Sequence, residues 1–278
     1  TFETPQSFYQ WGAITAVSAV LKDKVWINRY LYKLYPNIYT MIHAESGMKK
    51  GPAIALGKAL VKHSIGDSAI ISGRSSIQGI LKEMGASHSA PGGGIVSSNA
   101  TFICSSELSS SIVDDPVATR ILTDLYDRNY NEGQYKSLLK MESFSIKNPC
   151  ITMLTATNEA MADEFFQNSA IKGGYIARTF IVHESKRNRI NSLQVPPLLT
   201  INYVEMASYL KVLNKLNGPF KPTASRTHSP EFEYGIKDEV VDETHYYTKA
   251  GAVYEEWYHA FIKTVDEQEI KDETGTLN

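Results

Sequence analysis

Cysteine is scarce in this sequence, with only Cys104 and Cys150 among 278 residues. Both stand beside apolar runs typical of buried strands, so neither a disulfide framework nor a cysteine metal site is indicated. No segment approaches the ~18 uninterrupted apolar residues of a membrane span, and the first residues lack a basic region followed by an apolar one. These absences predict a cytoplasmic protein that has no membrane partner.

Charge of one sign is also missing, because 28 basic residues face 30 acidic ones. This balance argues against a chain that grips nucleic acid over its whole surface, although a local basic groove or a pore in an assembly is compatible with it. With 42% hydrophobic residues the chain can bury a sizeable core. The sequence begins with Thr1 rather than Met, and residues 272–278 show no feature that would end the fold, so we expect a piece of a longer protein.

Hydrophobic periodicity gives the organisation of the chain. Apolar residues at spacings of three and four from 5 to 34 predict an amphipathic helical lead-in, and 85–99 is interpreted as a flexible stretch. Further strands and helices are predicted in alternation: strands at 37–43, 68–72, 100–104, 150–156 and 175–183, and helices at 52–63, 76–84, 115–126 and 159–166. Two more helices, at 203–216 and 248–267, predict a C-terminal helical appendage.

This alternation predicts an α/β fold in which a mainly parallel sheet is flanked by helices. Ligands of such sheets bind beyond the carboxyl ends of the strands. We expect a helical lead-in over 1–36, the α/β core over 37–195 and a helical C-terminal region, itself truncated, over 196–278.

A candidate phosphate-binding loop follows the strand at 37–43. Such a loop needs a tight turn, inward N–H groups, a lysine and a helix N-terminus that faces the anion. Against the pattern G-x-x-x-x-G-K-[ST], only Lys50 matches, and Gly51 stands where a hydroxyl is usual. The alternative is a solvated turn. The predicted nucleotide-binding residues are Ala44, Glu45, Ser46, Gly47, Met48, Lys49, Lys50, Gly51 and Pro52.

Two further strands end in candidate catalytic groups. Glu107 follows the strand at 100–104, where P-loop ATPases polarise water or hold magnesium; alternatively it is an ordinary helix N-terminal glutamate. Thr157 and Asn158 end the strand at 150–156, where Asn158 could orient the attacking water and either could sense the γ-phosphate. Asn158 could equally cap the following helix.

Arg178 is the candidate arginine finger. It stands at the start of an apolar strand, exposed enough to reach a neighbouring subunit, and its planar, permanent charge suits the charge that develops on a γ-phosphate. The alternative is a surface ion pair.

Two segments, 85–99 and 128–147, are candidates for contact with DNA. In the second, Arg128, Lys136 and Lys140 alternate with tyrosines, a composition that suits single strands. Acidic residues dilute that charge, and mixed-charge loops of this size occur on many ATPases without touching nucleic acid.

Together these motifs carry a family resemblance. Arg178 and its flanks look like the Ser-Arg-Phe finger of minichromosome-maintenance helicases, and the chain over roughly 3–184 resembles more closely the replication ATPases of phages and prophages, with weaker similarity through Trp257. These are helicase-related P-loop NTPases with a RecA-like or AAA+ core. The matching features are Trp11, Tyr35-Pro36-Asn37, 46–51, Glu107, Ala156-Thr157 and 173–178.

The resemblance implies a ring-forming ATPase, a homohexamer that uses ATP and Mg²⁺ to move along single-stranded DNA in the replication of a mobile element. Lys50 would hold phosphate, Glu107 would activate water and Arg178 would act in trans. Two departures, Gly51 for the hydroxyl and Ser106 for an aspartate, leave no direct motif ligand for the metal. They favour the alternative of a weakly hydrolysing switch that partners a helicase. A metabolic kinase would need an acceptor base and a lid, and the sequence names neither.

Overall fold

The computed structural model describes residues 3–29, 32–68, 70–72, 76–85, 87–89, 95–97, 99–106, 116–127, 134–138, 143–158, 174–187, 202–219 and 260. The chain divides into two compact units, one of residues 1–26 and 34–217 and the other of residues 27–33 and 218–278. No helix in the described ranges combines the length and the apolar character that a bilayer crossing needs.

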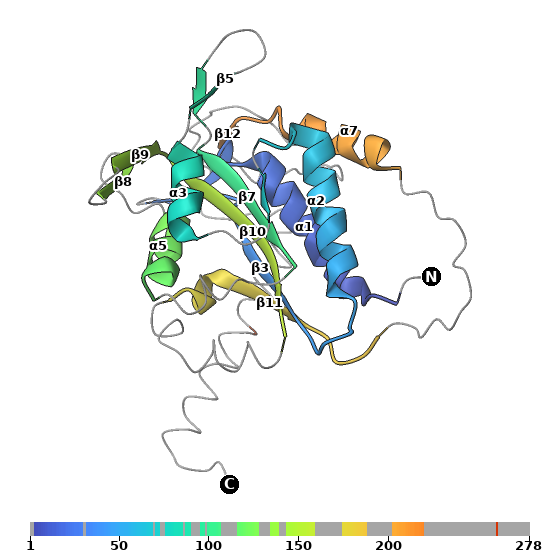
Figure 1. Ribbon diagram of the computed structural model, residues 1–278. Helices are drawn as coiled ribbons and strands as arrows, with labels where there is room; N and C mark the ends of the chain where they lie inside the picture. Colours follow the sequence, from blue (N-terminus) through green and yellow to red (C-terminus); the bar gives the residue numbers. More distant parts are fainter. Residues whose placement is uncertain are drawn as a thin grey trace. The chain divides into compact units, whose positions relative to one another are not determined.

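The first unit is built on a five-stranded parallel sheet of order β11-β3-β10-β7-β4 (Figure 1). The strands are β3 (Tyr39–His43), β4 (Ile70–Ser72), β7 (Ala100–Ser105), β10 (Cys150–Thr157) and β11 (Thr179–His183). All eight residues of β10 are buried, as expected for a central strand covered on both faces. The predicted α/β fold, with a mainly parallel sheet flanked by helices, is confirmed.

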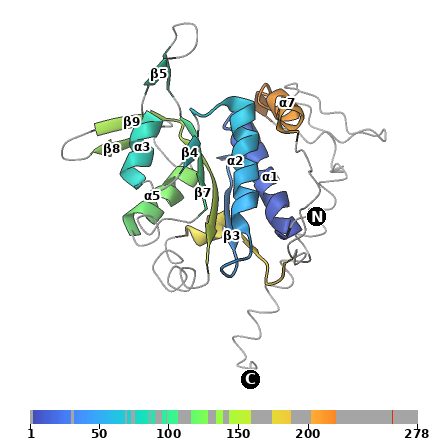
Figure 2. The ribbon, with the colours of Figure 1, turned by 45° about the vertical axis from the view of Figure 1, so that its right-hand side comes forward.

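Helices cover both faces of this sheet. Figures 1 and 2 show α1 (Gln6–Leu21) and α2 (Lys50–Ile65) on one side, and α3 (Ile77–Gly85) and α5 (Pro116–Asp127) on the other. Successive residues of β10 point to opposite faces, so Met153 joins the core under α3 and α5 while Leu154 joins the core under α1 and α2. Helix α7 (Tyr203–Leu213) packs against α2.

Two glycines bring α1 and α2 into backbone contact. A Cβ atom added to Gly12 would lie 3.0 Å from the carbonyl oxygen of Ala53. One added to Gly57 would lie 2.7 Å from Cδ2 of Leu154 and 3.2 Å from the carbonyl oxygen of Gly12. Thr15, a polar residue that α1 buries, has a partner in the sheet: its hydroxyl shares a hydrogen bond with that of Thr40 at 2.8 Å. Helix α1 is therefore part of the packed core.

The prediction of one helix over 5–34 is wrong. Helix α1 ends at Leu21, and Lys22 takes a left-handed φ of 56°. Strands β1 (Val25–Arg29) and β2 (Tyr32–Leu34) follow, and with β12 (Gly218–Pro219) they form a three-stranded sheet. The run of charges at 22–24 interrupts the helical pattern, and the aromatic and β-branched residues after it favour extended structure.

The stretch 85–99, interpreted as flexible, contains strands β5 (Ser87–Ser89) and β6 (Ile95–Ser97), which pair in antiparallel. A second antiparallel pair consists of β8 (Gln134–Leu138) and β9 (Ser143–Lys147). The predicted strand at 175–183 begins with a 3-10 turn, η2 (Ile176–Arg178), before β11. The predicted helices at 159–166 and 248–267 lie outside the described residues, apart from Ala260.

Candidate functional site

The loop between β3 and α2 leaves the sheet at the carboxyl end of an interior strand. Strand β3 pairs with β10 on one side and β11 on the other, so the loop begins where three strand ends meet. Gly47 has a φ of 86°, and Lys49, the residue before α2, has a φ of 55°. A left-handed lysine costs about 1–2 kcal/mol. This tight turn delivers the chain directly into the N-terminus of α2.

Lys49 is held at both ends by the residues just before α1. Its carbonyl oxygen accepts a hydrogen bond from Oγ1 of Thr4 at 2.9 Å, and Thr4 is 2% exposed. Its ammonium lies 3.9 Å from the carboxylate of Glu3. These contacts stabilise the strained backbone of Lys49 from outside the loop.

Lys50, the first residue of α2, folds back across the loop. Its Nζ donates to the carbonyl oxygens of Ala44 at 2.6 Å and Glu45 at 3.1 Å. A cation in the first turn of a helix is unfavourable by itself, because it adds to the positive end of the helix dipole. The same superposition of positive potentials is what binds an anion.

A pocket of about 170 Å³ opens in front of this turn. The ends of β3, β7 and β10 converge on it, since Thr157 pairs with His43 and Thr155 with Ser105 in the sheet register. The pocket is lined by Ser46, Gly47, Met48, Lys49, Lys50, Gly51, Ser106, Thr157 and Asn158. The structure thus brings most of the predicted loop together with both candidate sensor residues.

Three of the predicted loop residues, Ala44, Glu45 and Pro52, do not line the pocket, and Ala44 is fully buried. Glu107 lies outside the described residues, as do Arg128 and Lys140. Ser106, the residue before Glu107, lines the pocket. Lys136 lies on β8, opposite Ser145 of β9.

The edge of the sheet that carries the pocket also holds a thiol, that of Cys104 in β7. Burial raises the pKa of the Cys104 thiol to about 12, so that side chain stays protonated at neutral pH. Within the described ranges no group of three or more His, Cys, Asp or Glu side chains is placed to hold a metal. The residues that line the pocket do include three with hydroxyl groups, Ser46, Ser106 and Thr157. Magnesium needs few protein ligands when phosphates and water supply the others.

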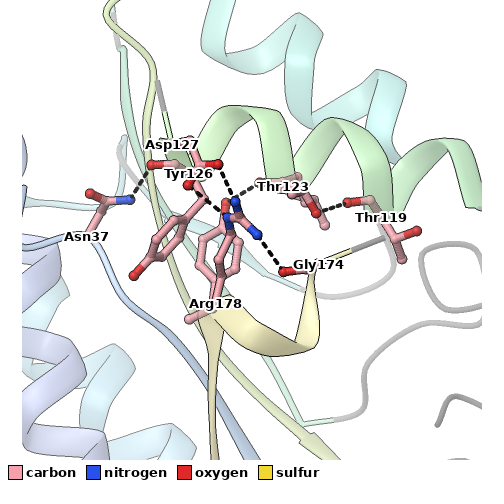
Figure 3. Close-up of polar contacts among 9 residues, drawn as sticks. Asn37, Thr119, Thr123, Tyr126, Asp127, Gly174 and Arg178 are labelled. Carbon is pink, nitrogen blue, oxygen red and sulfur yellow. Dashed lines mark hydrogen bonds and ion pairs between the residues drawn. The ribbon is translucent and has the colours of Figure 1, made fainter. Parts of the chain in front are cut away.

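Arg178 lies at the opposite end of the sheet. It precedes Thr179, which pairs with Tyr39 at the start of β3, whereas the loop follows His43 at the end of that strand. Figure 3 shows its guanidinium engaged on two sides: Nε donates to Asp127 at 2.8 Å, Nη1 donates to the carbonyl of Gly174 at 2.8 Å, and Nη2 also contacts the Asp127 carboxylate. The hydrogen bond to Asp127 raises the pKa of Arg178. Arg178 therefore cannot reach the loop of its own chain.

The Asp127 carboxylate needs this partner because it is the last residue of α5. A negative charge at a helix C-terminus is repelled by the helix dipole, and the guanidinium offsets that repulsion. The same helix end receives Asn37, whose amide donates to the carbonyl of Tyr126 at 3.3 Å. The cluster therefore ties α5 to the amino ends of β3 and β11.

We expect Arg178→Ala to lower the free energy of unfolding by about 1–2 kcal/mol, because the pair is bidentate and about three-quarters buried. Urea denaturation measures the loss. Arg120→Ala, an exposed position on the same helix, is the matched control and should stay within about 0.5 kcal/mol of the wild type. Equal stability of the two variants would show that the ion pair contributes nothing.

Sequence reasoning missed two features beside the loop. His43 and His183, a register pair, approach each other with their Nδ1 atoms 2.9 Å apart and their rings stacked. Arg187, four residues beyond β11, brings Nη2 to 3.2 Å from the position a Cβ atom of Gly47 would occupy. In the sequence, the only indication of the histidine pair or of Arg187 was that each of these polar residues ends or follows a predicted strand.

Comparison of the chain with protein-family models and with curated proteins finds no match.

Proposed function

We propose that the chain is a P-loop ATPase that binds ATP at 44–51 and hydrolyses it as part of a ring-forming DNA helicase or translocase. The observation that carries the proposal is the geometry of Lys50: its ammonium lies across the loop at the N-terminus of α2 and lines a polar pocket at the carboxyl edge of the sheet. A helix N-terminus and a lysine that meet at such a pocket suit the binding of a polyphosphate, and this supports the proposal.

In this proposal the phosphate chain replaces the carbonyl oxygens of Ala44 and Glu45 as the partners of the Lys50 ammonium. Asn158 and Thr157 line the same pocket and would orient the attacking water and contact the γ-phosphate. Glu107, next to the pocket-lining Ser106, would accept the proton from that water. Magnesium, bound with the nucleotide, would neutralise charge on the β- and γ-phosphates.

Assembly into a homohexameric ring is supported by Arg178. Because it lies at the other end of the sheet from its own loop, it can only serve a nucleotide held by a second copy. Reaching that nucleotide requires the bond to Asp127 to be exchanged for one to phosphate, which a guanidinium fork also binds through two oxygens. Single-stranded DNA is the proposed track, with Arg128, Lys136 and Lys140 as candidate contacts.

A nucleotide-dependent switch that hydrolyses ATP poorly and partners a helicase is the second candidate. Gly51 favours it, because it supplies no hydroxyl to magnesium and a Cβ atom there would meet nothing within 4 Å. There is therefore room for a side chain at position 51, but glycine supplies none. Ser106, in place of an acid, favours the same interpretation.

ATP hydrolysis with and without single-stranded DNA separates the two candidates. The motor predicts turnover that DNA stimulates and that Lys50→Ala, Glu107→Gln and Arg178→Ala each remove. Mixing Arg178→Ala with Glu107→Gln should restore part of the activity if the arginine acts in trans. Nucleotide binding without DNA-stimulated turnover in the wild type would discard the motor and leave the switch.

A further inference from the structure

A second cation approaches the loop from β11. Strand β11 is the parallel neighbour of β3, so the residues that follow both strands emerge at the same edge of the sheet. Arg187 follows β11, and its Nη2 lies 3.2 Å from the position of a Cβ atom on Gly47, which itself lines the pocket. The guanidinium therefore lies against the backbone of the phosphate loop.

Gly47 makes this approach feasible. At a φ of 86° the residue has a backbone conformation that a side chain would strain, and a Cβ atom would also crowd the arginine. The absence of that atom leaves room for the guanidinium beside Gly47, a residue that lines the pocket. Arg187 is exposed, and among the residues that the structure describes no hydrogen bond or ion pair of its side chain is found.

The charges around the pocket do not balance the negative charge of a bound nucleotide, so a further cation such as Arg187 would stabilise it. Among the residues that the structure describes, Lys50 is the cation that folds across the loop, whereas the ammonium of Lys49 faces Glu3. ATP carries more negative charge than one lysine and one magnesium ion neutralise, and Gly51 provides no hydroxyl to fix the metal. A guanidinium can bind two phosphate oxygens at once, and it keeps its charge at any working pH.

We propose that Arg187 is a phosphate-binding residue that acts in cis, contacting the polyphosphate chain of the nucleotide held by the same loop. This inference rests on the proposed nucleotide site. It gives the two arginines that flank β11 different tasks: Arg178, at the amino end, serves another copy, and Arg187, at the carboxyl end, serves its own.

Calorimetric titration with MgATP, and separately with inorganic tripolyphosphate, tests the assignment. Arg187→Ala should weaken both ligands by about tenfold or more, the effect expected for losing charge-assisted hydrogen bonds. Arg187→Lys should recover part of the affinity, because it keeps the charge but not the fork. Lys186→Ala is the matched control: this adjacent, exposed residue loses the same charge and should change affinity less than about threefold, since a charge that attracts the ligand only from a distance is screened by salt.

The outcomes separate this inference from the proposed function. If Lys50→Ala abolishes binding while Arg187→Ala behaves like Lys186→Ala, the role of Arg187 is wrong and the nucleotide site stands. If the wild type binds neither ligand, both are wrong. Thermal unfolding of the Arg187 variants should match the wild type, because the side chain is exposed, so a loss of affinity reports on the site rather than on the fold.

Discussion

Replacing Lys50 with alanine is expected to weaken ATP binding by about a hundredfold or more, as expected when two charge-assisted hydrogen bonds to phosphate are lost, and to leave no measurable hydrolysis. The reason is geometric: the Lys50 ammonium lies across the loop, bonded to the carbonyl oxygens of Ala44 and Glu45, where phosphate oxygens would take their place. Fluorescence or calorimetric titration with ATP measures the affinity, and phosphate release measures turnover.

Lys58→Ala is the control for this variant. It removes the same charge from the same helix, but its ammonium contacts the exposed hydroxyl of Ser72 at 3.0 Å rather than the loop. Its ATP affinity should therefore equal that of the wild type. Wild-type affinity in Lys50→Ala would contradict the phosphate-site assignment. Removing a cation from the first turn of α2 relieves repulsion by the helix dipole but also removes the two bonds to the loop carbonyls, so the unfolding midpoint of Lys50→Ala is measured beside its affinity.

The second large effect concerns the contact between α1 and α2. Gly57→Leu should lower the free energy of unfolding by about 3 kcal/mol or more, because the side chain would overpack a site where even a Cβ atom meets Leu154 at 2.7 Å and the backbone of Gly12 at 3.2 Å. Chemical denaturation measures the loss, and the midpoint should fall.

Gly51→Ala provides the matched comparison in the same helix. A Cβ atom on Gly51 has nothing within 4 Å, so this substitution should be neutral or stabilise by up to about 1 kcal/mol through reduced chain entropy. If Gly57→Leu proved as stable as Gly51→Ala, the helices would not be packed at backbone contact as described.

Sequence periodicity predicted the strands and helices of the core because those signals are local. The apolar runs that became β3, β7 and β10 are bounded by polar turn residues, and the helices between them have their own spacing. The prediction was wrong beyond Leu21, where aromatic and β-branched residues fall at helical spacing by coincidence. The strand order could not be predicted, because it depends on which nonlocal pairs of strands meet. In particular, β10 lies between β3 and β7 although it follows both in the chain.

The residues of the candidate site fall into the same two groups, those that local sequence signals predicted and those whose position depends on tertiary packing. Lys50, Thr157 and Asn158 were predicted because parallel strands place the residues that follow them at one edge. The partners of Arg178 could not be predicted: Asp127 lies 51 positions away and is brought close only because the end of α5 meets η2 in the folded chain. Arg187 was missed for a related reason, since its approach to Gly47 depends on β11 lying beside β3 rather than at the far edge.

The bond between Thr4 and Lys49 has a dynamic consequence. A ligand that draws the backbone of Lys49 toward the pocket must either stretch that bond or carry the first residues of α1 with it. Helix ends open locally at low free energy, and their amides exchange with solvent accordingly. Protection of the amides at the start of α1 should therefore follow occupancy of the loop, which makes the first turn of α1 a reporter of whether phosphate is bound.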